Sequence, residues 1–379
     1  MNAIPVLASG PTRAEMSPPT EARGRRLMSL DALRGFDMFW IMGGDQILRA
    51  LPEIDRNSVT TGLAAQMEHC AWAGFHFYDL IFPLFVFIMG ASLALSLPRM
   101  IERSGRPAAV RRVVTRSAIL FILGILYMGG VAHGFRNVYL AGVLHRIAVA
   151  YFFAALLFCF LRPRSLIPIC AALLIGYWAL MTFVPVPGIG APDLSQPGKN
   201  LAHYIDALYL PGQKFEGTLL STMAAVANCL LGVFAGLLLK SSLPGQRKVC
   251  WLLLAGALSL GAGFLWSLEF PIIKLLWTSS YVLVACGYAA LLLAAFYQVI
   301  EIWNWRAWSR PFVWMGMNAL TIYIVANVVG FHRLAARFCG GDVSAALGSA
   351  ADFVQAILAT AFAFLVVRYL YRRKIFLRL

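Results

Sequence analysis

Ten apolar segments, each about 20 residues long, constrain the fold of this 379-residue chain more than any other feature. A helix needs about 20 mostly apolar residues to cross the hydrocarbon core of a bilayer. Hydrophobic residues make up 60% of the sequence and charged residues only 13%, whereas roughly a quarter of a soluble domain is charged. The segments are 33–52, 76–98, 113–132, 139–161, 165–184, 217–239, 250–268, 275–300, 309–331 and 350–371. We therefore predict an all-α, polytopic membrane bundle of about ten transmembrane helices.

The basic residues predict how this bundle is oriented. The chain carries 32 Lys and Arg and has a net charge of +15. If both termini and alternate connections face the cytoplasm, 22 of the 32 fall on that side and 8 on the other, with Arg34 and Arg146 inside spans. Cytoplasmic loops of membrane proteins carry such an excess. We therefore predict cytoplasmic termini and a multi-pass protein of the inner membrane, and we do not interpret the positive charge as a sign of nucleic-acid binding.

The amino-terminal residues and the cysteines exclude other kinds of organisation. Residues 1–28 are rich in Pro, Ala, Arg and Glu and contain no apolar core of signal-peptide length. We predict that they form a disordered cytoplasmic tail and that 29–379 is one transmembrane domain. The seven cysteines show no CxxC or metal-ligand spacing, so we expect no disulfide framework and no metal.

The first apolar segment has the ionisable residues Arg34, Asp37 and Asp45 among its apolar ones. Ionisable side chains are costly in a membrane and are functional candidates for that reason. On an uninterrupted helix the three would share one polar stripe running from the cytoplasmic boundary toward the outer side. Arg34 and Asp37 are alternatively structural, with Arg34 pairing Asp31 or Asp37, whereas for Asp45 we favour a functional role.

A second cluster lies where the second apolar segment begins, on the side opposite the cytoplasm. It contains His69, Trp72 and Asp79. Imidazole is the side chain best suited to proton transfer near neutral pH. Asp79 lies within the span and needs a partner, for which Arg146 is a candidate, although a lone histidine at an interface is often just a solvated loop residue.

Several weaker signals come from the outer half of the predicted bundle. Each polar residue alone is typical of helix packing, and it is their convergence that indicates a site. These residues are Glu216, Asn228, Ser280, Tyr281 and Asn318.

The sequence around these residues resembles the transmembrane domain of the heparan-alpha-glucosaminide N-acetyltransferase family. The motifs are RLMSLDALRGFDMF, HCAWAGFHFYDLIFPLFVFIMGASL, GVLHRIAVAYF, VPVPG, LWTSSYV and PFVWMGMNALTIYIV, and the resemblance extends over about 26–379. It implies acetyl transfer from cytoplasmic acetyl-CoA to an amine or hydroxyl of a sugar on the far side. It also implies that His69, in the HxxWxG motif with Trp72 and Gly74, is catalytic.

The resemblance assigns roles to the remaining candidates. Asp45 stands where the lysosomal enzyme has Asn, and we expect it to be the catalytic partner of His69. Arg34 and the arginine-rich segment 99–116 are expected to hold the CoA phosphates. The full expectation is acetyl-CoA binding by Arg34, Asp37, Arg146, Asn228, Asn318, Ser280 and Tyr281, and acceptor binding by Trp72, Asp79 and Glu216.

Two functions remain open at this point. The expected partners of an acyltransferase are acetyl-CoA, a glycan acceptor and the bilayer, with a second copy of the chain as a further alternative. We expect no counterpart of the luminal domain of the lysosomal enzyme, so heparan sulfate is not indicated as the acceptor. The competing hypothesis is a proton-coupled transporter of a sugar or anion, since intramembrane Asp and Arg residues suit a carrier as well.

Overall fold

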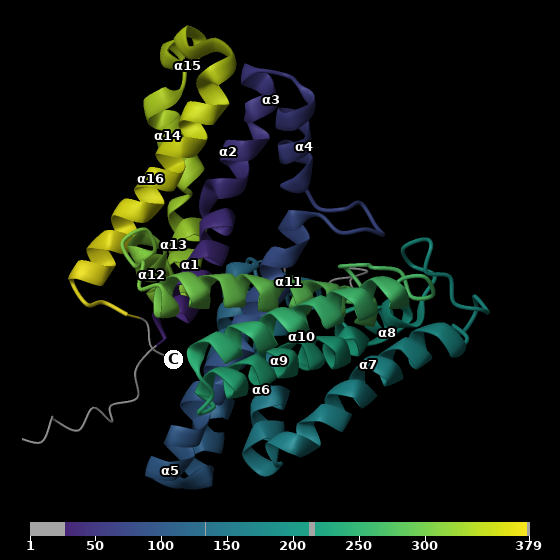
Figure 1. The fold of residues 1–379 in the computed structure, drawn as a ribbon. Helices are drawn as coiled ribbons and strands as arrows, with labels where there is room; N and C mark the ends of the chain where they lie inside the picture. Colours follow the sequence, from purple (N-terminus) through teal and green to yellow (C-terminus); the bar gives the residue numbers. More distant parts are fainter. Residues whose placement is uncertain (1–26, 133, 212–216, 377–379) are drawn as a thin grey trace, which may run out of the picture.

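The computed structural model describes residues 27–132, 134–211 and 217–376, and within them the named elements are all helices (Figure 1). They are α1 (Met28–Phe39), the π-helical η1 (Trp40–Gly44), α2 (Asp45–Arg49), α3 (Leu51–Ile54), α4 (Ser58–Gln66), α5 (Phe77–Tyr127), η2 (Phe135–Asn137), α6 (Val143–Phe160), η3 (Pro163–Ser165), α7 (Leu166–Phe183), α8 (Leu201–Tyr209), α9 (Thr218–Lys240), α10 (Gly245–Trp266), α11 (Ser279–Tyr297), η4 (Gln298–Ile302), α12 (Arg310–Met317), α13 (Ala319–Val329), α14 (Phe331–Cys339), α15 (Asp342–Leu347), η5 (Gly348–Ala350) and α16 (Ala351–Arg372).

The helices confirm the prediction of a polytopic helical membrane bundle. Seven helical segments among the described residues are long and apolar enough to cross a membrane, and α12 with α13, which meet at 80°, raise this number to eight. The 51-residue α5 carries two predicted segments, because its backbone leaves the helical region at Gly105 between them. The count of ten spans and the location of the termini stay predictions, and the predicted tail lies outside the described residues up to residue 26.

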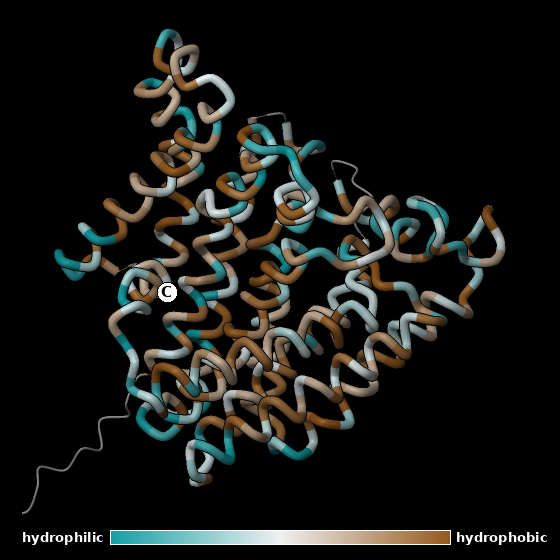
Figure 2. The backbone as a smooth tube through the Cα atoms, turned by 45° about the horizontal axis from the view of Figure 1, so that its top comes forward, coloured by the Kyte–Doolittle hydropathy of each residue, from teal (hydrophilic) through white to brown (hydrophobic). Residues whose placement is uncertain are grey.

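The helices pack into two apolar groups. The larger core joins α5, α6, α7, α9, α10 and α11, and the smaller one joins α1, η1, α12, α13, α14 and α16. In Figure 1, α9, α10 and α11 lie next to one another in one layer, and α14 lies beside α16 in a separate arm. Hydrophobic residues dominate the helices, whereas hydrophilic residues gather at their ends and in loops (Figure 2). The two groups meet at α1, whose Leu30 and Leu33 belong to the larger core and whose Met38 belongs to the smaller one, and which contacts α5 and α11.

Glycines allow the helix backbones to touch where the larger core is tightest. A Cβ atom at Gly90 of α5 would lie 2.0 Å from the carbonyl oxygen of Cys229 in α9. A Cβ atom at Gly232 of α9 would lie 2.0 Å from the carbonyl oxygen of Phe87. Small residues at such contacts are how membrane helices approach closely. This contact fixes α5, the helix on which the candidate site is built.

We predict that Gly90→Ala lowers the thermal unfolding midpoint of the purified protein. The added methyl group would meet backbone rather than a movable side chain, and overpacking of this kind costs about 1–3 kcal/mol. Gly261→Ala on α10 is the matched control, because a Cβ atom there meets nothing within 4 Å. Equal midpoints for the two variants would contradict the close packing of α5 on α9.

Candidate functional site

A cavity of about 1150 Å³ lies where the two groups of helices meet. Along the first half of α5 its lining extends from Tyr78 to Arg99. At 1.5 Å per residue this is about 30 Å, which is about the thickness of the hydrocarbon core. The polar side chains that line it include Asp31, Arg34, His69, Trp72, Tyr78, Ser92, Arg99, Arg116, Arg146, Lys274 and Tyr323. The cavity therefore joins one end of the bundle to the other.

One end of the cavity holds a cluster of three ionisable groups. The Nδ1 atom of His69 lies 2.8 Å from Oδ1 of Asp79. The Nζ atom of Lys274 lies 2.8 Å from Nδ1 and 3.0 Å from Nε2 of His69, and 3.4 Å from the same Asp79 oxygen. The His69 side chain is half exposed, whereas that of Asp79 is 1% exposed. A histidine is thus held between a buried carboxylate and an amine, where it can exchange protons with a group in the cavity.

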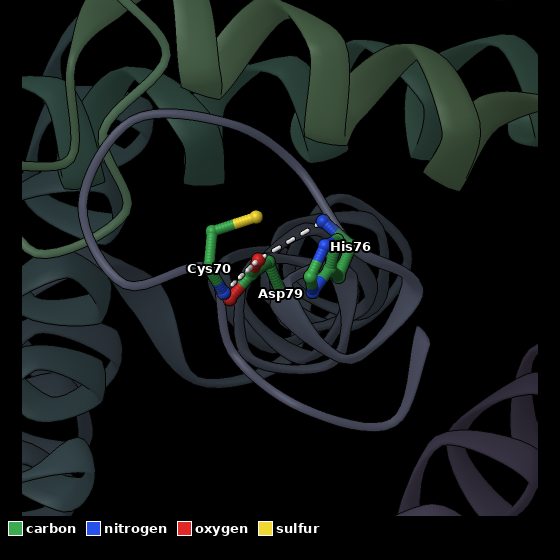
Figure 3. A group of neighbouring side chains, drawn as sticks. All are labelled: Cys70, His76 and Asp79. Atoms are coloured by element: carbon green, nitrogen blue, oxygen red, sulfur yellow. Dashed lines mark hydrogen bonds between the residues drawn. The ribbon is translucent and has the colours of Figure 1, made fainter. Parts of the chain in front are cut away.

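The first turn of α5 holds the Asp79 carboxylate in place. Its Oδ2 atom accepts hydrogen bonds from the backbone N–H groups of His76, at 3.0 Å, and Cys70, at 3.3 Å (Figure 3). A carboxylate near a helix N-terminus also interacts favourably with the helix dipole. The loop before α5 therefore wraps around Asp79 and brings His69 to it.

Cys70, His76 and Asp79 place potential metal-ligand atoms within 4.8 Å of one another. The arrangement is a poor fit for a cation, because both Asp79 oxygens already have partners and the Lys274 amine lies nearby. Burial, and after it the charge of Asp79, raises the pKa of the Cys70 thiol, which disfavours the thiolate that a metal binds. We assign no metal to this group, and the predicted absence of a metal stays a prediction.

Lys274, which the sequence reasoning did not single out, reaches His69 through a contact between two loops. Gly74 donates its N–H to the carbonyl oxygen of Ile272 at 2.9 Å, and Ala73 pairs with Ile273 in an isolated β-bridge. Burial lowers the pKa of the Lys274 amine to about 8, against the opposing effect of Asp79. The only signal in the sequence is its place just before the LWTSSYV motif.

The hydroxyl groups of that motif support the Lys274 loop. The Thr278 hydroxyl donates to the carbonyl oxygen of Pro271 at 2.8 Å and accepts from the N–H of Ile273 at 3.0 Å. The Ser280 hydroxyl donates to the carbonyl oxygen of Phe270 at 2.5 Å. Ser280 was predicted to bind acetyl-CoA, but it is fully buried and is not among the residues that line the cavity.

Tyr281 compensates for a proline in α5, and Asn228 binds a second backbone carbonyl beside it. Pro83 has no N–H, so the carbonyl group of Asp79, four residues earlier, lacks its helical donor. The Tyr281 hydroxyl donates to this carbonyl at 2.8 Å, and the Asn228 amide donates to the carbonyl of Pro83 at 3.1 Å. Both residues were predicted to bind acetyl-CoA. The structure instead gives them contacts with the α5 backbone, away from the cavity lining.

Arginines from three segments line the other end of the cavity. Arg34 of α1 donates to the Ser92 hydroxyl at 2.6 Å and to the carbonyl oxygen of Gly316 at 3.4 Å, and lies 3.5 Å from Asp31. Arg99 and Arg116 line the same cavity from the two halves of α5. The other arginines of the segment, Arg103, Arg106, Arg111 and Arg112, are exposed and do not line it.

The first segment is not the uninterrupted helix from which a shared polar stripe was predicted. The π-helical turn η1, with φ of 127° at Gly43, shifts the residues after it around the axis. Arg34 lines the cavity, whereas Asp37 is fully buried, and neither of its carboxylate oxygens has a hydrogen-bond partner among the described residues. Asp45 lies on the far side of the turn.

Asp45 does not contact His69 directly, as we had expected of a catalytic partner. Its carboxylate accepts from Gln46 at 3.0 Å and lies 3.8 Å from Arg49. Tyr78 lies near both, since Asp45 is among the groups that act on its hydroxyl and its ring centre lies 4.9 Å from that of the His69 imidazole. The carboxylate that contacts His69 is Asp79.

The other residues predicted to form the site lie at separate places in the structure. Arg146 lines the cavity with its guanidinium 4.7 Å from the centre of the Trp277 ring, and Lys274 contacts Asp79. Trp72 lines the cavity and donates to the carbonyl oxygen of Leu194 at 2.7 Å. Asn318 donates to the Trp314 carbonyl at the bend between α12 and α13. Glu216 lies outside the described residues.

Comparisons with known proteins agree with the sequence motifs. Residues 26–208 match the family described as "Heparan-alpha-glucosaminide N-acetyltransferase, catalytic". The mouse and human heparan-alpha-glucosaminide N-acetyltransferases are each 27% identical to this chain over 82% of its length. The alignment covers 56% of the mouse and 55% of the human protein, so the chain spans about half the length of these curated relatives. These matches confirm the resemblance to this family.

We predict that Tyr281→Phe destabilises the protein by about 1–3 kcal/mol, because it leaves the buried carbonyl of Asp79 without a donor. Tyr288→Phe is the matched control on the same helix, since no hydrogen bond of its hydroxyl is seen among the described residues. The measurement is the thermal unfolding midpoint in detergent. If the two variants behaved alike, the Tyr281 hydroxyl would not be what satisfies this carbonyl.

Proposed function

We propose that this chain, like the acetyltransferases it resembles, transfers an acetyl group from cytoplasmic acetyl-CoA to an amine or hydroxyl of a glycan on the periplasmic side. One observation carries the proposal. A single cavity joins a histidine–carboxylate pair, His69 with Asp79, to a cluster of arginines, Arg34, Arg99 and Arg116. A general base and a phosphate-binding surface are the two sites that a CoA-dependent transfer needs.

The arginine end is the proposed site for the phosphates of acetyl-CoA. Arginine binds phosphate through several donors in a fixed planar fork. The positive-inside asymmetry of the sequence supports a cytoplasmic location for this end, where acetyl-CoA is made. The uncharged arm of the donor would then follow the cavity along α5, with its thioester at His69.

His69 is the proposed base for the transfer. When its Nδ1–H donates to Asp79, Nε2 is left as a proton acceptor. The acceptor nitrogen or oxygen attacks the carbonyl carbon of the thioester and gives its proton to Nε2. The carbon–sulfur bond then breaks, and His69 returns the proton to the sulfur, which leaves as free CoA. Asp79 stabilises the imidazolium that exists between these steps.

The other candidates receive supporting roles in this proposal. Asp45 acts through Tyr78, whose ring lies against His69. Trp72 and Arg146, which line the His69 end of the cavity, are proposed to contact the acetyl group or the acceptor. Asp37 does not line the cavity. Its predicted role in acetyl-CoA binding stays a proposal.

We expect His69→Ala to lower the turnover of radiolabelled acetyl-CoA with a glycan acceptor by about 10²- to 10⁴-fold, the usual contribution of a general base. Binding of acetyl-CoA should persist, because the arginines lie at the other end of the cavity. His76→Ala is the matched control, since His76 contacts the carbonyl oxygen of Glu68 through its ring and does not line the cavity.

Full turnover in His69→Ala would remove the assignment of the base. An acetylated His69 in the absence of acceptor, detected by mass spectrometry, would replace direct transfer by a covalent route through the same residue. Substrate uptake into proteoliposomes without any transfer would favour the transporter hypothesis instead.

We also expect Arg99→Gln with Arg116→Gln to raise the apparent KM for acetyl-CoA by about tenfold or more with a smaller effect on kcat, the behaviour of uniform binding. The double variant Arg103→Gln with Arg112→Gln removes the same charge from arginines outside the cavity. Its KM should stay close to that of the unmodified protein at low salt. Equal effects of the two pairs would mean that the phosphates are held by general electrostatic attraction.

A further inference from the structure

The proposed roles of His69 as the base and of Asp79 as its carboxylate partner do not explain why Lys274 lies at the same end of the cavity. Lys274 lines the cavity there and contacts His69. Its amine lies 3.0 Å from Nε2, the atom at which the proposed transfer takes place. A carbonyl group that reacts beside Nε2 would therefore lie within reach of a positive charge.

We propose that Lys274 is a further catalytic residue, whose ammonium group stabilises the negative charge that develops on the carbonyl oxygen of the acyl group. The inference rests on the proposed function, since it deepens the chemistry of the same site. As the acceptor attacks the carbonyl carbon, the π electrons move onto the oxygen and form an oxyanion. This charge is returned when the carbon–sulfur bond breaks, and Lys274 keeps its proton throughout.

The surroundings of Lys274 favour this role. Its side chain is 20% exposed, and a charge in a partly water-excluded site interacts more strongly than the same charge in water. The loop that carries it is fixed by the β-bridge between Ala73 and Ile273 and by the Thr278 hydroxyl. An amine held in position before the reaction need not reorganise when the oxyanion forms.

The charges around Lys274 determine how it should respond to pH. It faces Asp79 of α5, His69 and Cys70 of the preceding loop, and Arg146 of α6. Burial lowers its pKa to about 8, Arg146 acts in the same direction, and Asp79 opposes both. The ammonium form is therefore present below about pH 8 and is lost above it, within the range in which activity can be measured.

We expect Lys274→Met to lower kcat by about 10²- to 10³-fold, the usual effect of removing one oxyanion donor, while acetyl-CoA binding at the other end of the cavity changes little. Lys199→Met removes an exposed lysine from another outer loop and should be neutral. In the unmodified protein, kcat should fall as the pH rises through about 8. In Lys274→Arg, which keeps its charge, this fall should move to higher pH.

All variants are assayed with the same acceptor, so that the effect of pH on the protonation of the acceptor is the same for each of them. If Arg does not fit the loop, Lys274→Ala with added methylammonium supplies the charge separately, and the expected result is partial recovery of kcat. Two results would overturn the inference while leaving the role of His69 and the proposed function in place. One is a wild-type kcat in Lys274→Met. The other is an unchanged fall of kcat above pH 8 in Lys274→Arg, together with no recovery of kcat by methylammonium in Lys274→Ala. If the unmodified protein transfers no acetyl group, the proposed function fails and this inference fails with it.

Discussion

The candidate site depends on the buried carboxylate of Asp79. A buried charge is tolerated only when it is paired and hydrogen-bonded, and here one carboxylate contacts His69, Lys274 and two backbone N–H groups. These partners come from the loop before α5 and from the loop before α11, which are far apart in the sequence. The carboxylate therefore draws two loops onto the first turn of one helix, and the cluster forms only when all three are assembled.

The proline one turn into α5 links this cluster to the surrounding bundle. Pro83 removes the helical donor of the Asp79 carbonyl, and Tyr281 of α11 replaces it. Because α11 begins directly after the Lys274 loop, the same segment places the amine at His69 and satisfies the backbone of Asp79. The LWTSSYV motif thus acts as a support for the site, and its hydroxyl groups bind backbone carbonyls of this loop and of neighbouring helices.

The sequence predicted the fold class because hydropathy is a local property, and the HxxWxG motif, through the resemblance, drew attention to His69, whose catalytic role stays a prediction. The contact between Lys274 and His69 joins residues 205 positions apart, and no local pattern reveals such a pair. Asp45 was misplaced because helical periodicity was extrapolated across a π-helical turn at Gly43. Tyr281, Ser280 and Asn228 were found by their polarity, yet polarity alone does not distinguish a ligand contact from a hydrogen bond to a backbone carbonyl.

The side chains that line the middle of the cavity, between its two polar ends, affect which molecules can pass along it. This middle part is lined by apolar side chains, among them Met38, Ile81, Phe82, Phe85 and Met89. A sugar or an anion that crossed the bundle would lose its hydration there without gaining hydrogen-bond partners, which is costly. An uncharged arm anchored by its phosphates at the arginine end meets a smaller cost, because its charged part stays outside the apolar section. The division of the cavity into a basic end, an apolar middle and a histidine end thus favours group transfer over passage of the whole substrate.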